Sequence, residues 1–154
     1  MNLYLKPVYQ AVYGHPFEST FEHRMEMQKA IYLLKEMGVP VGNYGFYWYL
    51  HGPYSQGLQN DILALPNQDN QVITFSNENK VAIDKLAQLL NKETEYTSSN
   101  WAECVASLHY IKVNLLPKSA TDVDIVNMLQ EKKPHLSNFE LNMIALEDVE
   151  QLFS

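Results

Sequence analysis

The chain has 154 residues, 46% of them apolar and 19% charged, which predicts one globular domain over residues 1–154 and excludes a disordered chain. The formal net charge is −7, and Arg24 is the only arginine among the eleven basic residues. Because phosphate recognition relies on arginine and on clustered basic side chains, these numbers argue against a nucleic-acid partner.

Two helices are predicted at the start of the chain. Residues 3–13 carry apolar side chains at helical spacing, and Gly14 and Pro16 end the pattern. Ser19 is the expected N-cap of the second helix, where Glu22 would complete a capping box. The expected apolar stripe of this second helix consists of Met27, Ala30, Ile31, Leu34 and Met37.

The segment YGFYWYLHGPYSQGL, residues 44–58, concentrates six aromatic rings. Rings favour extended backbone, so a strand is predicted near 46–50. Two outcomes are open for its outer face: the helix over 3–13 covers it, or it stays exposed as a contact surface. Alternation along the strand predicts Phe46, Trp48 and Leu50 in the core, and Tyr47 and Tyr49 on the outer face.

A turn and a short helix are expected next. Gly52 and Pro53 should end the strand, because Pro cannot donate to a ladder and Gly permits the turn. Ser55 should cap a helix over 56–65, and the alternating QVITFS at 71–76 predicts a second strand. The fold class is therefore mainly α with a small antiparallel β-sheet (α+β). The strand–helix–strand order would also fit a winged-helix-like core.

Helices fill the remainder of the prediction. They cover 78–91, 100–116 with Asn100 as a cap, and 121–132. The last helix is expected to start with Ser137 as its N-cap. The predicted core consists of Leu34, Phe46, Trp48, Leu58, Ile62, Leu86, Leu89, Val105, Leu108, Leu141 and Ile144.

Patterns typical of catalysis or of cofactor binding are missing from the sequence. The five histidines stand far apart, without HxxxH or CxxC spacing, so no metal site is predicted. The single cysteine, Cys104, lies on an apolar helical stripe, which favours a structural role in a reducing compartment. With no signal peptide and no apolar run of about 18 residues, a cytoplasmic protein that does not enter a membrane is expected, with no cofactor.

Polar residues accompany the aromatic segment and give the candidate binding site. His51 can titrate near neutral pH, and a tyrosine in the turn can donate a hydrogen bond. Three of these polar residues also have a structural explanation: Ser55 as a helix cap, Lys29 as a surface charge and His51 as a turn residue. The candidate binding residues are Gln28, Lys29, Tyr47, Tyr49, His51, Tyr54 and Ser55.

The segment MQKAIYLLKEMGVPVGNYGFYWYLHGPYSQGLQNDI, residues 27–62, resembles the small prokaryotic YwgA-like proteins and, more distantly, the Panacea (SocA-like antitoxin) domain. The shared features are a Gln-Lys pair leading into Tyr-Leu-Leu, then Tyr-x-Phe-x-Trp-Tyr, then Gly-Pro-Tyr-Ser. The resemblance implies a mostly helical domain with a small sheet, often found near mobile elements, that acts through protein contacts. In the Panacea pattern Val follows Gly-Pro, whereas this chain has Tyr54.

Three functional hypotheses follow. The first is a non-enzymatic protein-binding module, antitoxin-like or an adaptor, whose partner is basic because complementary charge speeds encounter. The second is a winged-helix DNA-binding transcriptional regulator, although the candidate recognition helix within 55–65 contains no Lys or Arg. The third is a small enzyme built around His51 and Tyr54.

Overall fold

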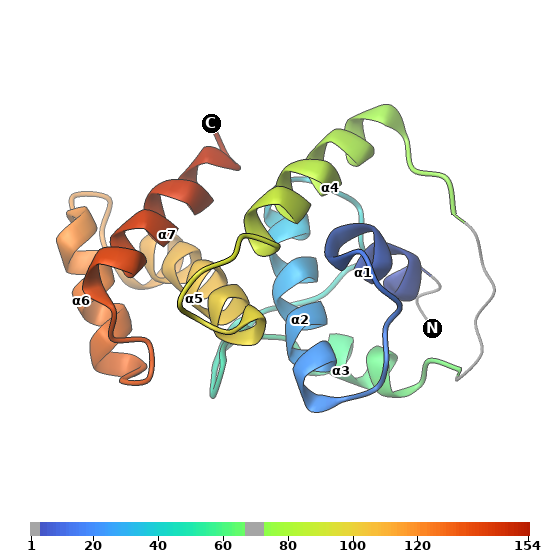
Figure 1. Cartoon of the computed structure of the whole chain (residues 1–154), viewed down its shortest axis with the longest axis horizontal. Coiled ribbons are helices and arrows are strands. Elements are labelled where there is room, and N and C mark those ends of the chain that lie inside the picture. The colour runs from blue at the N-terminus through green and yellow to red at the C-terminus, as the bar shows by residue number, and fades with distance from the viewer. Residues whose placement is uncertain (1–3, 67–72) are drawn as a thin grey trace.

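A computed structural model describes residues 4–66 and 73–154. Within these ranges the chain is mainly helical and contains one two-stranded antiparallel sheet, so the α+β prediction is confirmed (Figure 1). A short π-helical turn, η1, continues the fifth helix. The elements are α1 (Leu5–Tyr13), α2 (Phe21–Glu36), β1 (Tyr47–Tyr49), β2 (Gly52–Tyr54), α3 (Gln56–Leu63), α4 (Asn77–Leu90), α5 (Ser98–Tyr110), η1 (Ile111–Leu115), α6 (Asp122–Lys132) and α7 (Phe139–Gln151).

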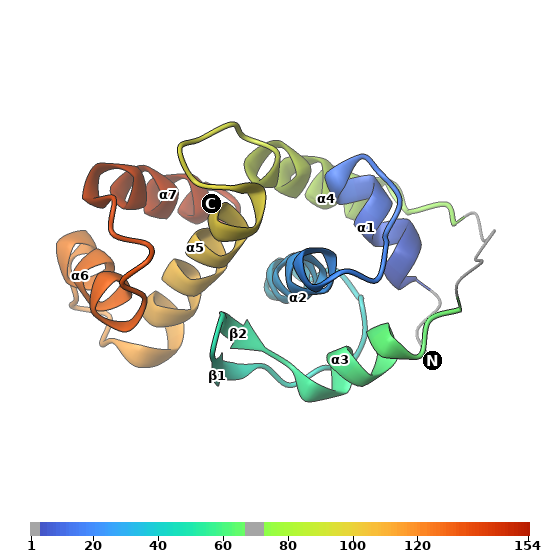
Figure 2. The same ribbon diagram turned by 60° about the horizontal axis from the view of Figure 1, so that its bottom comes forward.

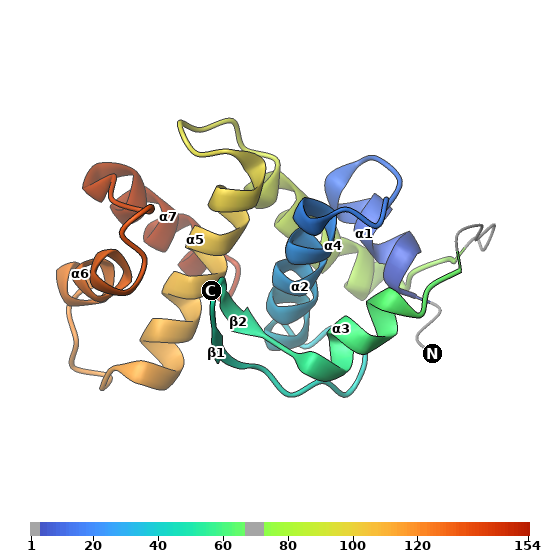
Figure 3. The same cartoon turned by 90° about the horizontal axis from the view of Figure 1, so that it is seen from below.

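Two helices, α2 and α5, form the centre of the molecule and pack against each other. Helices α1, α3 and α4 pack around α2, while α6 and α7 pack against α5 (Figure 3). All residues from Met25 to Leu34 in α2, and from Trp101 to His109 in α5, are buried. Because α2 is enclosed around its whole circumference, it buries polar side chains together with its apolar stripe. The expectation that Lys29 is a surface charge is therefore wrong.

The hairpin is built differently from the predicted sheet. Strand β1 pairs with β2, with Tyr47 opposite Tyr54, Trp48 opposite Pro53 and Tyr49 opposite Gly52. Gly52 and Pro53 thus lie in the second strand, where Pro is tolerated because both strands are edge strands. The strand predicted at 71–76 is wrong for 73–76, which are not in a strand, while 71–72 lie outside the described residues. The strand–helix–strand order that suggested a winged-helix-like core is not found in the described chain.

Helix caps differ from the prediction at three starts. Thr20 caps α2 in place of Ser19, Thr97 caps α5 in place of Asn100, and Asn138 caps α7 in place of Ser137. Ser, Thr and Asn are all strong N-caps, so composition alone cannot choose between neighbours. The Ser55 cap is confirmed, since its hydroxyl accepts the Leu58 backbone N–H at 3.2 Å. The other caps accept from His23, Asn100 and Leu141.

Most of the predicted core is buried. Leu50 and Ile144 are the exceptions that lie at the surface, because Leu50 belongs to the turn between the strands and Ile144 to the outer face of α7. Phe46, Trp48 and Leu141 are half-buried against the core. The residues confirmed as buried are Leu34, Leu58, Ile62, Leu86, Leu89, Val105 and Leu108.

Candidate functional site

The β-hairpin is fixed to the centre of the molecule by two adjacent side chains of α2. The Gln28 amide pairs with the backbone of Ser55: Nε2 donates to the Ser55 carbonyl and Oε1 accepts its N–H, both at 2.9 Å. The Lys29 ammonium donates to the Pro53 carbonyl at 2.8 Å. These three bonds satisfy buried backbone groups of β2 and of the start of α3, so Gln28, Lys29 and Ser55 hold the hairpin in place.

A buried carboxylate from α5, Glu103, lies beneath the same hairpin. Its side chain is 1% exposed, and Oε1 lies 2.9 Å from His135 Nε2 and 3.9 Å from His51 Nδ1. Oε2 lies 3.8 Å from Lys133 Nζ and accepts no hydrogen bond from the described residues. We call these four residues the Glu103 cluster. It joins the hairpin turn to α5 and to the segment after α6.

Lys133 also holds the turn directly. Its ammonium donates to the carbonyl of Tyr49 at 3.2 Å and to that of Leu50. These residues are more than eighty positions apart in the sequence, so no local pattern connects them. One signal was nevertheless present: Glu103 interrupts a predicted apolar helix, and a carboxylate in such a helix is usually paired when buried.

Burial alters the acid–base behaviour of the cations under the hairpin. Desolvation lowers the pKa of Lys29 to about 7, against a smaller opposing effect of Glu103. Desolvation also lowers the pKa values of Lys133 and His51, again opposed by Glu103. The basic side chains beneath the hairpin therefore all interact with one buried carboxylate, that of Glu103.

The stability of the fold should rise with pH because of Lys29. Its pKa in the folded chain, about 7, lies below its ordinary value of 10.5. Between these values the unfolded chain holds a proton that the folded chain has released, so the free energy of unfolding increases as pH rises. The slope for one proton is at most about 1.4 kcal/mol per pH unit. Urea denaturation at pH 7, 8 and 9 measures it.

The matched control is Lys35→Met, which removes an exposed lysine from the same helix. We expect Lys29→Met to remove most of the rise in stability between pH 7 and pH 9, and Lys35→Met to retain it. A rise that is equally steep in wild type and in Lys29→Met would contradict this assignment.

The outer face of the hairpin carries three tyrosine rings in mutual contact. Ring centroids of Tyr49 and Tyr54 lie 5.0 Å apart, those of Tyr47 and Tyr54 5.9 Å, and those of Tyr47 and Tyr49 6.1 Å. Tyr47 is 43% exposed and Tyr49 49%. We call these three residues the hairpin face. The alternative that the first helix covers it is wrong, because α1 packs on α4 and α2, across the molecule from the hairpin (Figure 2).

The predicted site residues thus divide into two groups. Gln28, Lys29 and Ser55 are buried and position the hairpin. His51 is partly exposed at the turn, where its ring contacts Phe21 edge-on at 5.3 Å. The remaining three, Tyr47, Tyr49 and Tyr54, form the hairpin face. The structure therefore brings all seven to one hairpin, but only His51 and the three tyrosines are accessible to a partner.

No protein-family model, no curated protein and no solved structure matches this chain. Among the helices of 4–66 and 73–154, none has the length and apolar content needed to cross a bilayer. Across the same ranges, His, Cys, Asp and Glu side chains form no group of three that could hold a metal ion. The function of the hairpin is therefore inferred from its own geometry and chemistry.

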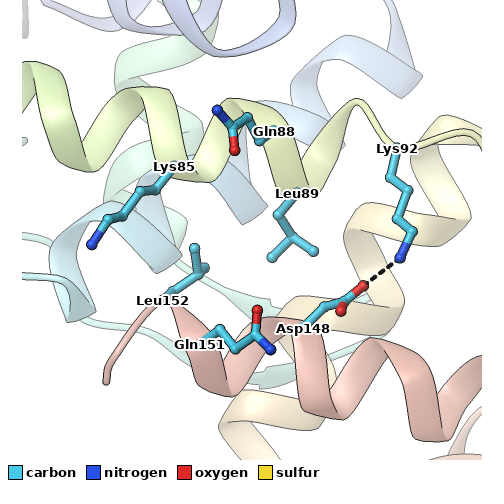
Figure 4. Close-up of a pocket in the computed structure, with 7 residues that line it drawn as sticks. All are labelled: Lys85, Gln88, Leu89, Lys92, Asp148, Gln151 and Leu152. Carbon is cyan, nitrogen blue, oxygen red and sulfur yellow. Dashed lines mark hydrogen bonds and ion pairs between the residues drawn. The ribbon is translucent and has the colours of Figure 1, made fainter.

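A separate crevice of about 330 Å³ lies between α4 and the end of α7 (Figure 4). An ion pair between Lys92 and Asp148, 2.7 Å long, crosses one end of it. Its polar side chains are exposed apart from Asp148, which is half-buried, and no fully buried titratable group lines it. The crevice is better explained as the seam between two packed helices than as a binding site. Its lining residues are Lys85, Gln88, Leu89, Lys92, Asp148, Gln151 and Leu152.

Proposed function

We propose that this chain is a non-enzymatic protein-binding module, antitoxin-like or an adaptor, that contacts its partner through the hairpin face. The observation that carries the proposal is a set of three mutually packed tyrosines, partly exposed, on a hairpin anchored from beneath. Tyrosine combines large apolar contact area with a hydroxyl and loses little conformational entropy on docking.

The anchoring beneath the face supports this proposal. Bonds from Gln28, Lys29 and Lys133 fix the hairpin backbone before any partner arrives. A preformed surface loses less conformational freedom on binding than a mobile loop does. Neighbouring exposed apolar side chains, Phe21 and Leu50, extend the contact area. The resemblance to YwgA-like and Panacea domains favours the same kind of activity.

The net charge of −7 favours a basic partner, because opposite net charges accelerate encounter. The association rate should accordingly fall as salt is raised from 50 to 500 mM.

The hairpin face is tested by replacing its rings one at a time. Tyr47→Ser and Tyr49→Ser should each weaken capture of the partner by roughly tenfold or more, as is usual for an interface tyrosine. The melting temperature should stay within about 2 °C, because both rings are half exposed and support little of the core. The measurement is a tagged pull-down from the source cell, quantified by mass spectrometry, with thermal melts of each variant.

The matched control is Phe139→Ser, which removes a comparably exposed ring from the start of α7. A captured protein should be lost from both tyrosine variants and kept by this control. Equal capture by all variants would overturn the proposal. So would a fall in melting temperature of several degrees, because the rings would then serve the fold.

A further inference from the structure

A shallow groove of about 430 Å³ adjoins the hairpin face on the side of α6. Trp48, Tyr49 and Leu50 from the hairpin form one wall, and Lys132, Lys133 and His135 form the other. We call it the hairpin groove. Tyr49 belongs to both surfaces, so the groove continues the proposed contact area.

The walls of the hairpin groove are apolar on one side and cationic on the other. Leu50 is 68% exposed, the highest value among the large apolar side chains of the described chain. The Lys132 ammonium lies 5.9 Å from the centre of the Trp48 ring, and that of Lys133 lies 5.2 Å from it. Apolar surface bordered by charge is typical of a site that binds a peptide segment with both kinds of side chain.

The charge of the groove is opposite to that of the protein. The chain as a whole carries −7, yet no Asp or Glu is among the described residues that line the groove. Glu103 lies beneath it and is engaged by His135 and Lys133. Lys132 forms no ion pair with any described residue, so its ammonium is available to a ligand.

We infer that the hairpin groove holds an acidic segment of the partner protein, with carboxylates toward Lys132 and His135 and an aliphatic or aromatic side chain against Leu50 and Trp48. The inference rests on the proposed function and specifies the segment that docks. It agrees with a basic partner, because net charge governs attraction at long range whereas the groove acts at contact. A carboxylate that approaches Lys132 would meet an ammonium that contacts the Trp48 ring but forms no ion pair with any described residue.

The test uses the full chain and two synthetic seven-residue peptides, in which Glu alternates with Leu and Phe, or Lys replaces every Glu. In an NMR titration at 50 mM salt, the acidic peptide should shift the Trp48 indole N–H and the His135 ring signals. The Lys peptide should shift neither. Lys132→Glu should weaken binding of the acidic peptide roughly tenfold, because a rim cation becomes repulsive.

Lys80→Glu is the matched control: it changes net charge equally, but from an exposed position on α4, away from the hairpin (Figure 2). Equal weakening by Lys80→Glu, binding of both peptides alike, or no shift at millimolar acidic peptide would each overturn the inference. So would tighter binding of a single-stranded oligonucleotide. If the peptide test fails while tyrosine-dependent capture persists, the groove assignment falls and the proposed function stands. If the acidic peptide binds as expected but capture of the partner does not depend on the tyrosines, the proposed function is rejected.

Discussion

Gly52→Ala is expected to destabilise the protein by about 2–5 kcal/mol, as measured by urea denaturation. Gly52 has φ = 86°, a left-handed conformation that costs an L-residue about 1–2 kcal/mol. A Cβ at this position would also lie 2.2 Å from Ser107 Oγ. Ser107 is completely buried in α5, and such overpacking costs about 1–3 kcal/mol.

Two further variants separate the backbone cost from the steric cost. Gly14 has a similar φ of 79° but nothing lies within 4 Å of its added Cβ, so Gly14→Ala should show the backbone cost alone. Ser107 Oγ has no hydrogen-bond partner among the described residues, which makes Ser107→Ala well tolerated. Adding Ser107→Ala to Gly52→Ala should therefore recover the part of the stability that the steric clash removes. If this double variant is as unstable as Gly52→Ala, the clash is not the cause.

Glu103→Gln is expected to cost about 3–5 kcal/mol at pH 6, the usual range when one partner of a buried ion pair is removed. Glutamine preserves the size of the side chain and can still accept from His135. It cannot offset the positive charges of Lys133 and Lys29, which would remain beneath the hairpin without their shared carboxylate. Denaturant unfolding followed at pH 6 and pH 9 measures the effect.

The cost of Glu103→Gln should shrink as pH rises, because Lys29, whose pKa is lowered to about 7, loses its proton and needs no countercharge. Glu26→Gln is the matched control. Glu26 is also buried, but its carboxylate accepts from the Ser98 hydroxyl and pairs with no Lys, Arg or His side chain of the described chain. It should therefore cost less, about 1 kcal/mol, with little pH dependence. Equal costs for both variants at pH 6 would reject the charge-balance explanation.

The helices could be predicted from the sequence because their determinants lie within a few residues of one another. Ser55 is an example, since its hydroxyl reaches a backbone N–H three residues on. The hairpin partner of β1 was misplaced because Gly52 and Pro53 disfavour strands in general. Their fit here depends on close contact with Ser107 and on an edge position for Pro53, which local sequence does not specify.

The candidate site could be predicted only in part. Its residues within 28–55 were found because they cluster in sequence and belong to the quoted resemblance. The Glu103 cluster was missed because Glu103, Lys133 and His135 meet only through the packing of α5 with α6 and α7. Lys29 was placed at the surface because a lysine in an amphipathic helix usually lies there. Only the enclosure of α2 on every side reverses that expectation.

The order in which the chain is synthesised has a consequence for the hairpin. Its strands leave the ribosome early, but Glu103 follows some fifty residues later, and Lys133 is 83 positions beyond Leu50. Short two-stranded hairpins are marginally stable alone in water. The tyrosines should therefore become a rigid surface only after residue 135 has emerged and folded against α5. Under the proposed function, contact through the hairpin face would therefore be limited to molecules whose helices have assembled.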